Sequence, residues 1–222
     1  MGESTSAAAR PAGEADRLEV RVSGSGGQGI LLAAAVLADA VAAAGREVVQ
    51  TQSYGPEARG GASQAEVIAS NEPIDYPEID LADISLCLSQ AAFDKYAHLT
   101  RAGGLVLYDS GVVNEAELPE LRLVGLPFTH TATNDLGARV VTNIVSLGSL
   151  AAFIDWLPVE AVDGAVAARV PAKFKDLNLR ALEAGRRLVE LQEAGVAIEG
   201  AESHDDADGG DSIVCEPCGD ER

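Results

Sequence analysis

Apolar and polar positions alternate in short runs along this chain from Leu18 onward. Residues 18–23 place apolar side chains between charged ones, which is typical of a strand with one better-covered face. Residues 28–44 combine Ile, Leu and Val with many alanines, so they predict a helix packed closely against a sheet, and Gly45 is suited to end it. A second strand over 46–52 completes a strand–helix–strand unit.

The same alternation continues through the middle of the chain and gives way to helical segments. Further strands are predicted over 62–69, 84–89, 105–108 and 121–126, with a helix over 91–99, a turn at 103–104, and later helices over 138–154, 159–168 and 173–194. Strands that alternate with helices at this spacing predict an α/β fold. We expect a single doubly wound, mostly parallel sheet, Rossmann-like or flavodoxin-like, followed by C-terminal helices.

Composition sets the two ends of the chain apart from its middle. Residues 1–17 are rich in Ala, Ser, Gly and Glu, and residues 199–222 hold nine acids and one base. Neither end has enough apolar residues to order itself by burial. We therefore expect a disordered leader over 1–17, one domain over 18–195, and a disordered acidic tail over 196–222.

The overall charge excludes several classes of function. The chain has 35 Asp and Glu against 16 Lys and Arg, a net charge of −19, which argues against binding nucleic acid or an anionic membrane surface. It has no free apolar stretch of about 20 residues and no secretory leader, so we expect a cytoplasmic protein.

Residues 1–6 formally fit the N-myristoylation pattern, a match that we interpret as chance.

The chain contains three cysteines, Cys87, Cys215 and Cys218, too few for a disulfide scaffold or for an iron–sulfur cluster within one chain. Cys87 lies in an apolar run and is expected to be a buried structural thiol. The Cys215–Cys218 pair has metal-ligand spacing, and His204 or a second copy of the chain could complete a site. A lone pair in such a tail is more often a chance or redox-labile feature, and we assign no metal site.

The first candidate site is the Gly-rich turn Gly24-Ser25-Gly26-Gly27-Gln28-Gly29, between the first strand and the first helix. Such a turn can present bare backbone N–H groups to an anion at a helix N-terminus. An NAD site usually adds an acid at the end of the second strand, where this chain has Gln50-Thr51-Gln52. NAD or FAD is therefore a minority interpretation, beside three others: a phosphate-bearing ligand other than a dinucleotide, a docked partner backbone, or a turn that serves packing alone.

The second candidate site is the loop Ser53-Tyr54-Gly55-Pro56-Glu57-Ala58-Arg59-Gly60-Gly61. Arg59 could clamp a phosphate or carboxylate, or it could form a salt bridge with Glu57 that holds the loop in shape. Tyr54 could contact a ligand or anchor the loop on the core. His98 and His130 have no evident Ser or Cys partner, so we predict no catalytic residue in this chain.

The two loops together, followed by Ile74-Asp75-Tyr76-Pro77, resemble the gamma subunit of the 2-oxoacid:ferredoxin oxidoreductases, most closely that of the 2-oxoglutarate enzyme. The resemblance covers residues 18–195. It implies a heteromeric enzyme that decarboxylates a 2-oxoacid on thiamine diphosphate and Mg²⁺, passes electrons through an iron–sulfur cluster to ferredoxin, and transfers the acyl group to coenzyme A. It places the thiamine site on the alpha and beta subunits, and associates the gamma subunit with assembly and coenzyme A.

Carried over to this sequence, the resemblance assigns both loops to the cofactor-binding side of the junction with the other subunits. The residues concerned are Gly24, Gly26, Gly27, Gln28, Gly29, Tyr54, Gly55, Glu57, Arg59, Gly60 and Gly61. It leaves open which 2-oxoacid is used, and whether the loops contact coenzyme A or only partner subunits. The alternatives are a free-standing Rossmann-type nucleotide-binding protein or dehydrogenase, and the smaller subunit of the indolepyruvate enzyme, which the second loop disfavours.

Overall fold

A computed structural model of the 222-residue chain describes residues 16–53, 62–114 and 116–200. Several predictions fall outside these ranges: almost all of the leader, most of the acidic tail with His204, Cys215 and Cys218, and the second Gly-rich loop. The site residues Tyr54, Gly55, Glu57, Arg59, Gly60 and Gly61 therefore lie outside the described residues.

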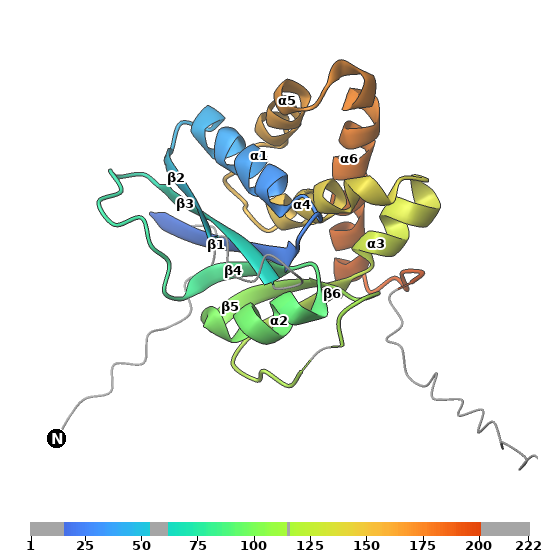
Figure 1. Cartoon of the computed structure of the whole chain (residues 1–222), viewed down its shortest axis with the longest axis horizontal. Helices are drawn as coiled ribbons and strands as arrows, with labels where there is room; N and C mark the ends of the chain where they lie inside the picture. The colour runs from blue at the N-terminus through green and yellow to red at the C-terminus, as the bar shows by residue number, and fades with distance from the viewer. Residues whose placement is uncertain (1–15, 54–61, 115, 201–222) are drawn as a thin grey trace, which may run out of the picture.

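Strands and helices alternate as the hydrophobic pattern predicts (Figure 1). The elements are β1 (Arg17–Ser25), α1 (Ile30–Ala43), β2 (Glu47–Ser53), β3 (Ala62–Ser70), β4 (Ala82–Cys87), α2 (Gln90–Tyr96), β5 (Thr100–Asp109), β6 (Arg122–Leu126), α3 (Phe128–His130), α4 (Thr142–Ala152), α5 (Val159–Arg169) and α6 (Lys175–Glu193). None of the described helices has the length and apolar character needed to cross a membrane.

The strands form one sheet in the order β2-β3-β1-β4-β5-β6. Strands β1, β4, β5 and β6 pair in parallel, whereas β3 runs antiparallel to both of its neighbours, β1 and β2. The prediction of an α/β fold with a mostly parallel sheet is confirmed. The chain extends the sheet first to one side of β1 and then to the other, which makes the carboxyl end of β1 a topological switch point.

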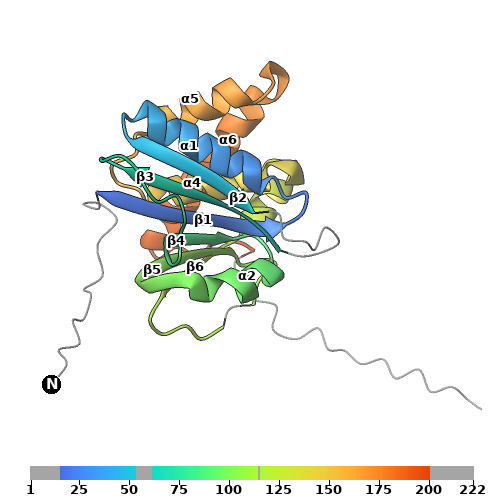
Figure 2. The ribbon, with the colours of Figure 1, turned by 60° about the vertical axis from the view of Figure 1, so that its left-hand side comes forward.

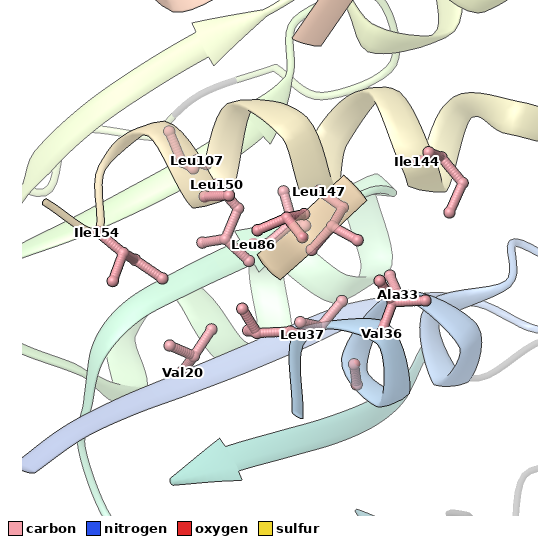
Figure 3. Close-up of a cluster of buried hydrophobic side chains, with 14 of the residues drawn as sticks. Val20, Ala33, Val36, Leu37, Leu86, Leu107, Ile144, Leu147, Leu150 and Ile154 are labelled. Atoms are coloured by element: carbon pink, nitrogen blue, oxygen red, sulfur yellow. The ribbon is translucent and has the colours of Figure 1, made fainter. Parts of the chain in front are cut away.

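Helices cover both faces of the sheet, as a doubly wound fold requires (Figures 1 and 2). Helices α1, α4, α5 and α6 lie on one face, and α2 lies on the other. The larger core gathers side chains from α1, α4 and the strands (Figure 3), including Leu37, Leu86 and Leu147. The opposite face packs Phe93 of α2 against Tyr108 of β5, with ring centroids 5.4 Å apart.

Helices α4 and α6 approach each other closely because two glycines meet at their crossing. A Cβ atom on Gly185 would lie 1.9 Å from the carbonyl oxygen of Val145, and one on Gly148 would lie 2.2 Å from that of Leu182. The Ser149 hydroxyl donates a hydrogen bond to the Gly185 carbonyl (2.6 Å) across the same contact. This crossing fixes the positions of both helix N-termini, which reach the candidate site.

The largest differences from the predicted boundaries are in β5 and before α4. The predicted turn at Gly103–Gly104 lies inside β5, where the pairing register with β4 shifts between Ala82 and Ile84. Gly103 has a φ of 76°, and a Cβ atom on Gly104 would lie 2.7 Å from Thr100 Cγ2, 2.8 Å from the Arg101 carbonyl oxygen and 2.9 Å from the Asp83 carbonyl oxygen. The two glycines therefore form a local bend inside β5 that also lies close to β4. The helix predicted over 138–154 begins as a 3₁₀ turn at residues 139–141 before α4.

Candidate functional site

The first Gly-rich loop lies at the carboxyl edge of the sheet, between β1 and α1. Strand β1 continues through Gly24 to Ser25, and α1 begins at Ile30, so the turn consists of residues 26–29, of which the first two are exposed. In α/β sheets of this kind, ligands bind outside the carboxyl ends of the strands at the point where the strand order reverses. The predicted loop therefore lies at the position where folds of this kind usually bind a ligand.

The side chain of Gln28 holds this loop in shape. Its Oε1 accepts a hydrogen bond from the Ser25 N–H (2.6 Å), and its Nε2 donates to the Leu88 carbonyl (2.8 Å). The Gln28 N–H also donates to the Ser25 carbonyl at 3.2 Å. Because Leu88 directly follows β4, these bonds tie the loop to the neighbouring strand. Gln28 is thus a positioning residue, with both ends of its amide engaged inside the protein.

The glycines of the loop divide into two classes. A Cβ atom on Gly24 would lie 2.6 Å from Gln28 Oε1, and one on Gly29 would lie 2.5 Å from Asn143 Nδ2. Gly29 also has a φ of 72°, a conformation that other residues rarely adopt. The packing of the chain itself explains these two glycines.

Gly26 and Gly27 are exposed, and a Cβ atom on either would meet nothing within 4 Å. Gly27 needs glycine for its φ of 88°, but neither strain nor crowding requires it at Gly26. The bare backbone of Gly26 is therefore free for close approach from outside the chain.

The N-terminus of α1 opens at this loop. Gly29 is the N-cap and supplies no side-chain cap, while its carbonyl accepts the first helical hydrogen bond from Ala33 (3.1 Å) and another from Asn143 Nδ2 (3.1 Å). The first-turn N–H groups of an α-helix have no partner inside the helix, and the dipole is positive at this end. The arrangement favours an anion or a carbonyl oxygen in front of the loop.

The loop separates two cavities. The larger, about 610 Å³, lies between the loop and the N-termini of α4 and α6, with Arg139 and Asn143 in its wall. The smaller, about 310 Å³, is lined by Ser25, Gly26 and the start of β3 at Ser63 and Gln64. A ligand or a partner chain can therefore reach the loop from two sides.

The two ends of the second predicted loop lie beside the first. Ser25 at the end of β1 pairs with Ala62 at the start of β3, and Gln64 pairs with Ser53 at the end of β2. Both attachment points of residues 54–61 are therefore at the carboxyl edge, next to the smaller cavity. This register supports the expectation that the two loops serve one site.

The structure adds a buried acid that the sequence analysis passed over. Asp109 ends β5 and is fully buried; it accepts hydrogen bonds from the Thr129 hydroxyl, the Thr129 N–H (3.1 Å) and the Gly111 N–H (3.3 Å). Burial raises the pKa of its carboxyl above the ordinary value, although these hydrogen bonds act in the opposite direction. An acid at a strand end was the sequence signal for it.

The other candidate residues do not assemble into a catalytic group. Cys87 is buried as expected, and burial raises the pKa of its thiol to about 11, so it is not a nucleophile. His98 precedes β5, at the opposite edge of the sheet from His130 in α3. Within the described ranges, no three His, Cys, Asp or Glu side chains gather as metal ligands.

Comparison with known proteins agrees with this fold and with the paired loops. A family model described as pyruvate ferredoxin/flavodoxin oxidoreductase matches residues 19–188. The chain is 44% identical over 172 residues to the 2-oxoglutarate synthase subunit KorC of Methanocaldococcus jannaschii, covering 76% of this chain and 92% of that subunit. These matches confirm the resemblance inferred from the two loops.

A solved structure and a longer relative extend the comparison. The gamma subunit of a keto/oxoacid ferredoxin oxidoreductase from Geobacter sulfurreducens superposes with a TM-score of 0.73 at 40% identity, covering 79% of this chain and 98% of that one. The ketoisovalerate oxidoreductase subunit VorA of Methanothermobacter marburgensis is 34% identical over 76% of this chain but only 36% of its own length. The same fold thus occurs both as a separate subunit and within a longer chain.

Proposed function

The chain belongs to the pyruvate ferredoxin/flavodoxin oxidoreductase family, and from that premise we propose that it acts as the gamma subunit of a 2-oxoglutarate:ferredoxin oxidoreductase. The observation that carries the proposal is the match to a 2-oxoglutarate synthase subunit at 44% identity over 92% of its length. The chain is then one subunit of an oxidoreductase whose electron acceptor is ferredoxin, and its partners are the alpha and beta subunits.

The proposed reaction is the oxidative decarboxylation of 2-oxoglutarate. The complex releases CO₂, transfers the remaining acyl group to coenzyme A as a thioester, and passes the electrons to ferredoxin. We propose the cytoplasm as the location of this reaction.

The redox and thiamine chemistry belongs, in this proposal, to the other subunits. Thiamine diphosphate with Mg²⁺ supplies decarboxylation, and iron–sulfur clusters supply electron transfer. The residues described in this chain do not fit these groups, because no metal-ligand cluster is present among them and the one cysteine they include, Cys87, is buried with a raised pKa.

The role proposed for the chain itself is to form the coenzyme A side of the active-site junction. Gly26 offers a bare, exposed backbone beside the smaller cavity, and the uncapped N-terminus of α1 favours a negatively charged or carbonyl group there. Gly24, Gln28 and Gly29 hold this surface in place through their contacts inside the fold. A free-standing dinucleotide enzyme fits less well, because β2 ends without the acid expected for a ribose.

Purification from the native source tests the proposal directly. We expect the chain to come out with larger partners that contain thiamine diphosphate and iron, and the complex to reduce ferredoxin with 2-oxoglutarate and coenzyme A. A chain that comes out alone would contradict the proposal. Tight binding of NAD or FAD to that isolated chain, without binding of coenzyme A, would favour the dinucleotide alternative.

A substitution at Gly26 tests the role of the loop. Gly26→Val adds a side chain where the fold has free space, so the complex should assemble while the KM for coenzyme A rises at least about tenfold. Gly164→Val is the control, because Gly164 of α5 is likewise exposed with nothing near a Cβ atom. An unchanged KM with normal assembly would contradict the coenzyme A role, and weakened assembly would assign the loop to a partner subunit.

A further inference from the structure

Two large apolar side chains stand exposed over the larger cavity. Val140 is 82% exposed and Phe174 is 45% exposed, and both line the cavity of about 610 Å³. Leu32, Val141 and Leu177 continue this apolar surface inward. Single exposed apolar residues are ordinary, whereas two over one apolar hollow form a patch of the kind that binds another molecule. We call Val140, Phe174 and the cavity between them the 140/174 patch.

The surroundings of the 140/174 patch are positively charged on a strongly acidic protein. Arg139 lines the cavity, and Lys173 and Lys175 flank Phe174 in the sequence, with the Lys173 ammonium 4.7 Å from the centroid of the Phe174 ring. All three are exposed, and none forms an ion pair with any residue in the described part of the chain. Asp176 is the one acid in the two segments that carry them, 139–143 and 170–178. The whole chain has a net charge of −19, so the positive charge around the 140/174 patch is opposite in sign to the net charge of the protein.

Three helix N-termini add to this positive potential. Gly29, Val141 and Phe174 are the N-caps of α1, α4 and α6, all three line the larger cavity, and none supplies a side-chain cap. The positive ends of three helix dipoles therefore lie in the wall of one cavity. The close crossing of α4 and α6 at Gly148 and Gly185 holds two of these ends in place.

We infer that the 140/174 patch is where a partner subunit of the oxidoreductase docks, through a segment that places an apolar side chain in the cavity and Asp or Glu carboxylates against Arg139, Lys173 and Lys175. This inference rests on the proposed function, because it takes the occupant from the same complex. A phosphate ligand would match the cations but would leave Val140 and Phe174 in water. A second copy in a two-fold dimer would bring the same cations to face one another.

The test is assembly of the complete complex with variants of this chain. Val140→Asp places a charge in the apolar contact, and Phe174→Ala removes an aromatic anchor; each should weaken binding to the partner subunits at least about tenfold. Arg139→Glu with Lys173→Glu should slow association and reduce its dependence on salt. Val159→Asp is the matched control, because Val159 is 46% exposed at the start of α5 and lies outside the cavity wall.

The outcomes separate this inference from the proposed function. If wild type assembles and both Val140→Asp and Phe174→Ala assemble equally well, the docking inference is overturned and the proposed function stands. The same holds if the variants assemble normally but raise the KM for coenzyme A, which makes the cavity a ligand site, or if they abolish only self-association. If wild type itself does not assemble with thiamine- and iron-containing subunits, both are overturned. Melting temperatures equal to wild type show that Val140→Asp and Phe174→Ala are folded.

Discussion

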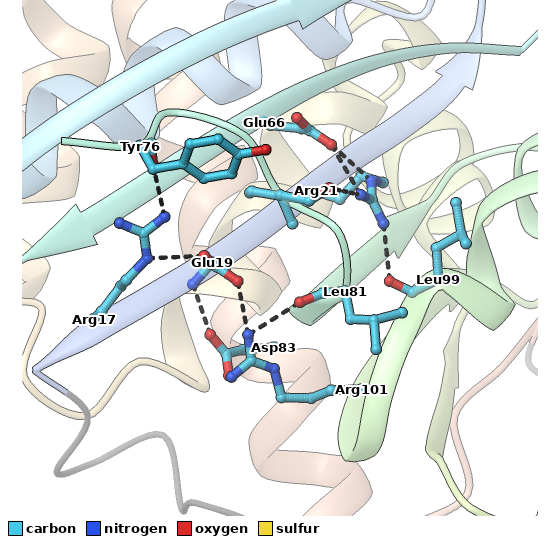
Figure 4. A network of polar contacts seen from close by, with 10 residues as sticks. Arg17, Glu19, Arg21, Glu66, Tyr76, Leu81, Asp83, Leu99 and Arg101 are labelled. Atoms are coloured by element: carbon cyan, nitrogen blue, oxygen red, sulfur yellow. Dashed lines mark hydrogen bonds and ion pairs between the residues drawn. The ribbon is translucent and has the colours of Figure 1, made fainter. Parts of the chain in front are cut away.

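The two edges of the central sheet, at the amino and the carboxyl ends of its parallel strands, differ in how their charged side chains are paired. At the amino edge, Arg17 and Arg101 contact Glu19 at 2.8 and 2.7 Å, and Arg101 also contacts Asp83 at 3.0 Å (Figure 4). The Glu19 N–H donates a further hydrogen bond to Asp83 at 2.7 Å. Each of these charges has a partner inside the chain.

At the carboxyl edge, by contrast, several charged side chains have no ion-pair partner within the described residues. There, the cations Arg139, Lys173 and Lys175 lack ion pairs within the described residues, Val140 is exposed, and α1 begins without a side-chain cap. In the two proposals above, the amino edge serves the fold and other molecules complete the carboxyl edge. Variants at the first should change stability, and variants at the second should change assembly or activity.

The largest effect is expected at Arg21, on the face of the sheet that α2 covers. Arg21 is 2% exposed; it pairs with Glu66 at 2.9 Å and donates to the carbonyls of Ile79 and Leu99. Arg21→Met leaves the Glu66 carboxylate and both carbonyls without that donor, so the free energy of unfolding should fall by about 3–5 kcal/mol in urea titrations. Arg139→Met, the control at the carboxyl edge, should change it by less than about 0.5 kcal/mol. Equal losses of unfolding free energy in the two variants would contradict the distinction between the two edges.

Glycine substitutions in the first loop separate, within the carboxyl edge, a residue that serves the fold from one that does not. Gly29→Ala forces a Cβ atom into a left-handed conformation and against Asn143, so we expect a loss of about 2 kcal/mol. Gly26→Ala meets no such obstacle and should stay within about 0.5 kcal/mol of wild type. Thermal or urea unfolding of the isolated chain measures both. A stability loss at Gly26 comparable with that at Gly29 would show that Gly26 also serves the fold.

A smaller effect is expected at the exposed part of the amino edge. Arg101 is 38% exposed at its side chain, so water screens its contacts with Glu19 and Asp83. Arg101→Gln should lower the free energy of unfolding by at most about 1 kcal/mol, and the difference from wild type should shrink in 1 M salt. Arg169→Gln, which removes an exposed pair with Asp39, is the matched control. A salt-independent loss well above that size would indicate a role in packing instead.

The sequence predicted the sheet and its order of elements because periodicity depends on neighbours along the chain. The strand over 18–23 and the helix over 28–44 appear in the structure as β1 and α1, with boundaries moved by one or two residues. The turn predicted at Gly103–Gly104 is a bend with a positive φ at Gly103, but it lies inside β5 instead of before it, because the chain pairs with β4 on both sides of the bend. Such distinctions depend on long-range contacts.

The candidate site was predictable in part for the same reason. The motif located Gly24 to Gly29 correctly at a strand end, but it could not show that Gln28 is engaged inside the fold or that Gly26 alone is unconstrained. Asn143 and Phe174 come from segments more than 100 residues away and carry no motif. Only the crossing of α4 and α6 brings them to the loop.

The buried acid Asp109 differs from the acids of the amino edge in the partners of its carboxylate. At the amino edge Glu19 and Asp83 contact guanidinium groups, whereas Asp109 at the carboxyl edge accepts its hydrogen bonds from Thr129 and Gly111, which are neutral donors. Arg139 acts on Asp109 only beyond ion-pair distance. Burial therefore raises the pKa of Asp109. Because the pKa in the folded state lies above the unfolded value of about 3.9, the fold prefers the protonated acid. Its contribution to stability is complete below that unfolded value and is lost as pH rises through the folded pKa.

This sign can be read from the difference between wild type and Asp109→Asn. Asn cannot titrate, so the free energy of unfolding of wild type should fall relative to Asp109→Asn as pH rises above about 4, and the difference should level off once Asp109 is ionised in the folded state. Urea titrations over a pH series measure this slope, with Asp94→Asn as a control for an exposed acid on α2. A difference that grows in favour of wild type with rising pH would mean that the hydrogen bonds and the charge of Arg139 outweigh burial. The contrast between the edges would then rest on the unpaired cations alone.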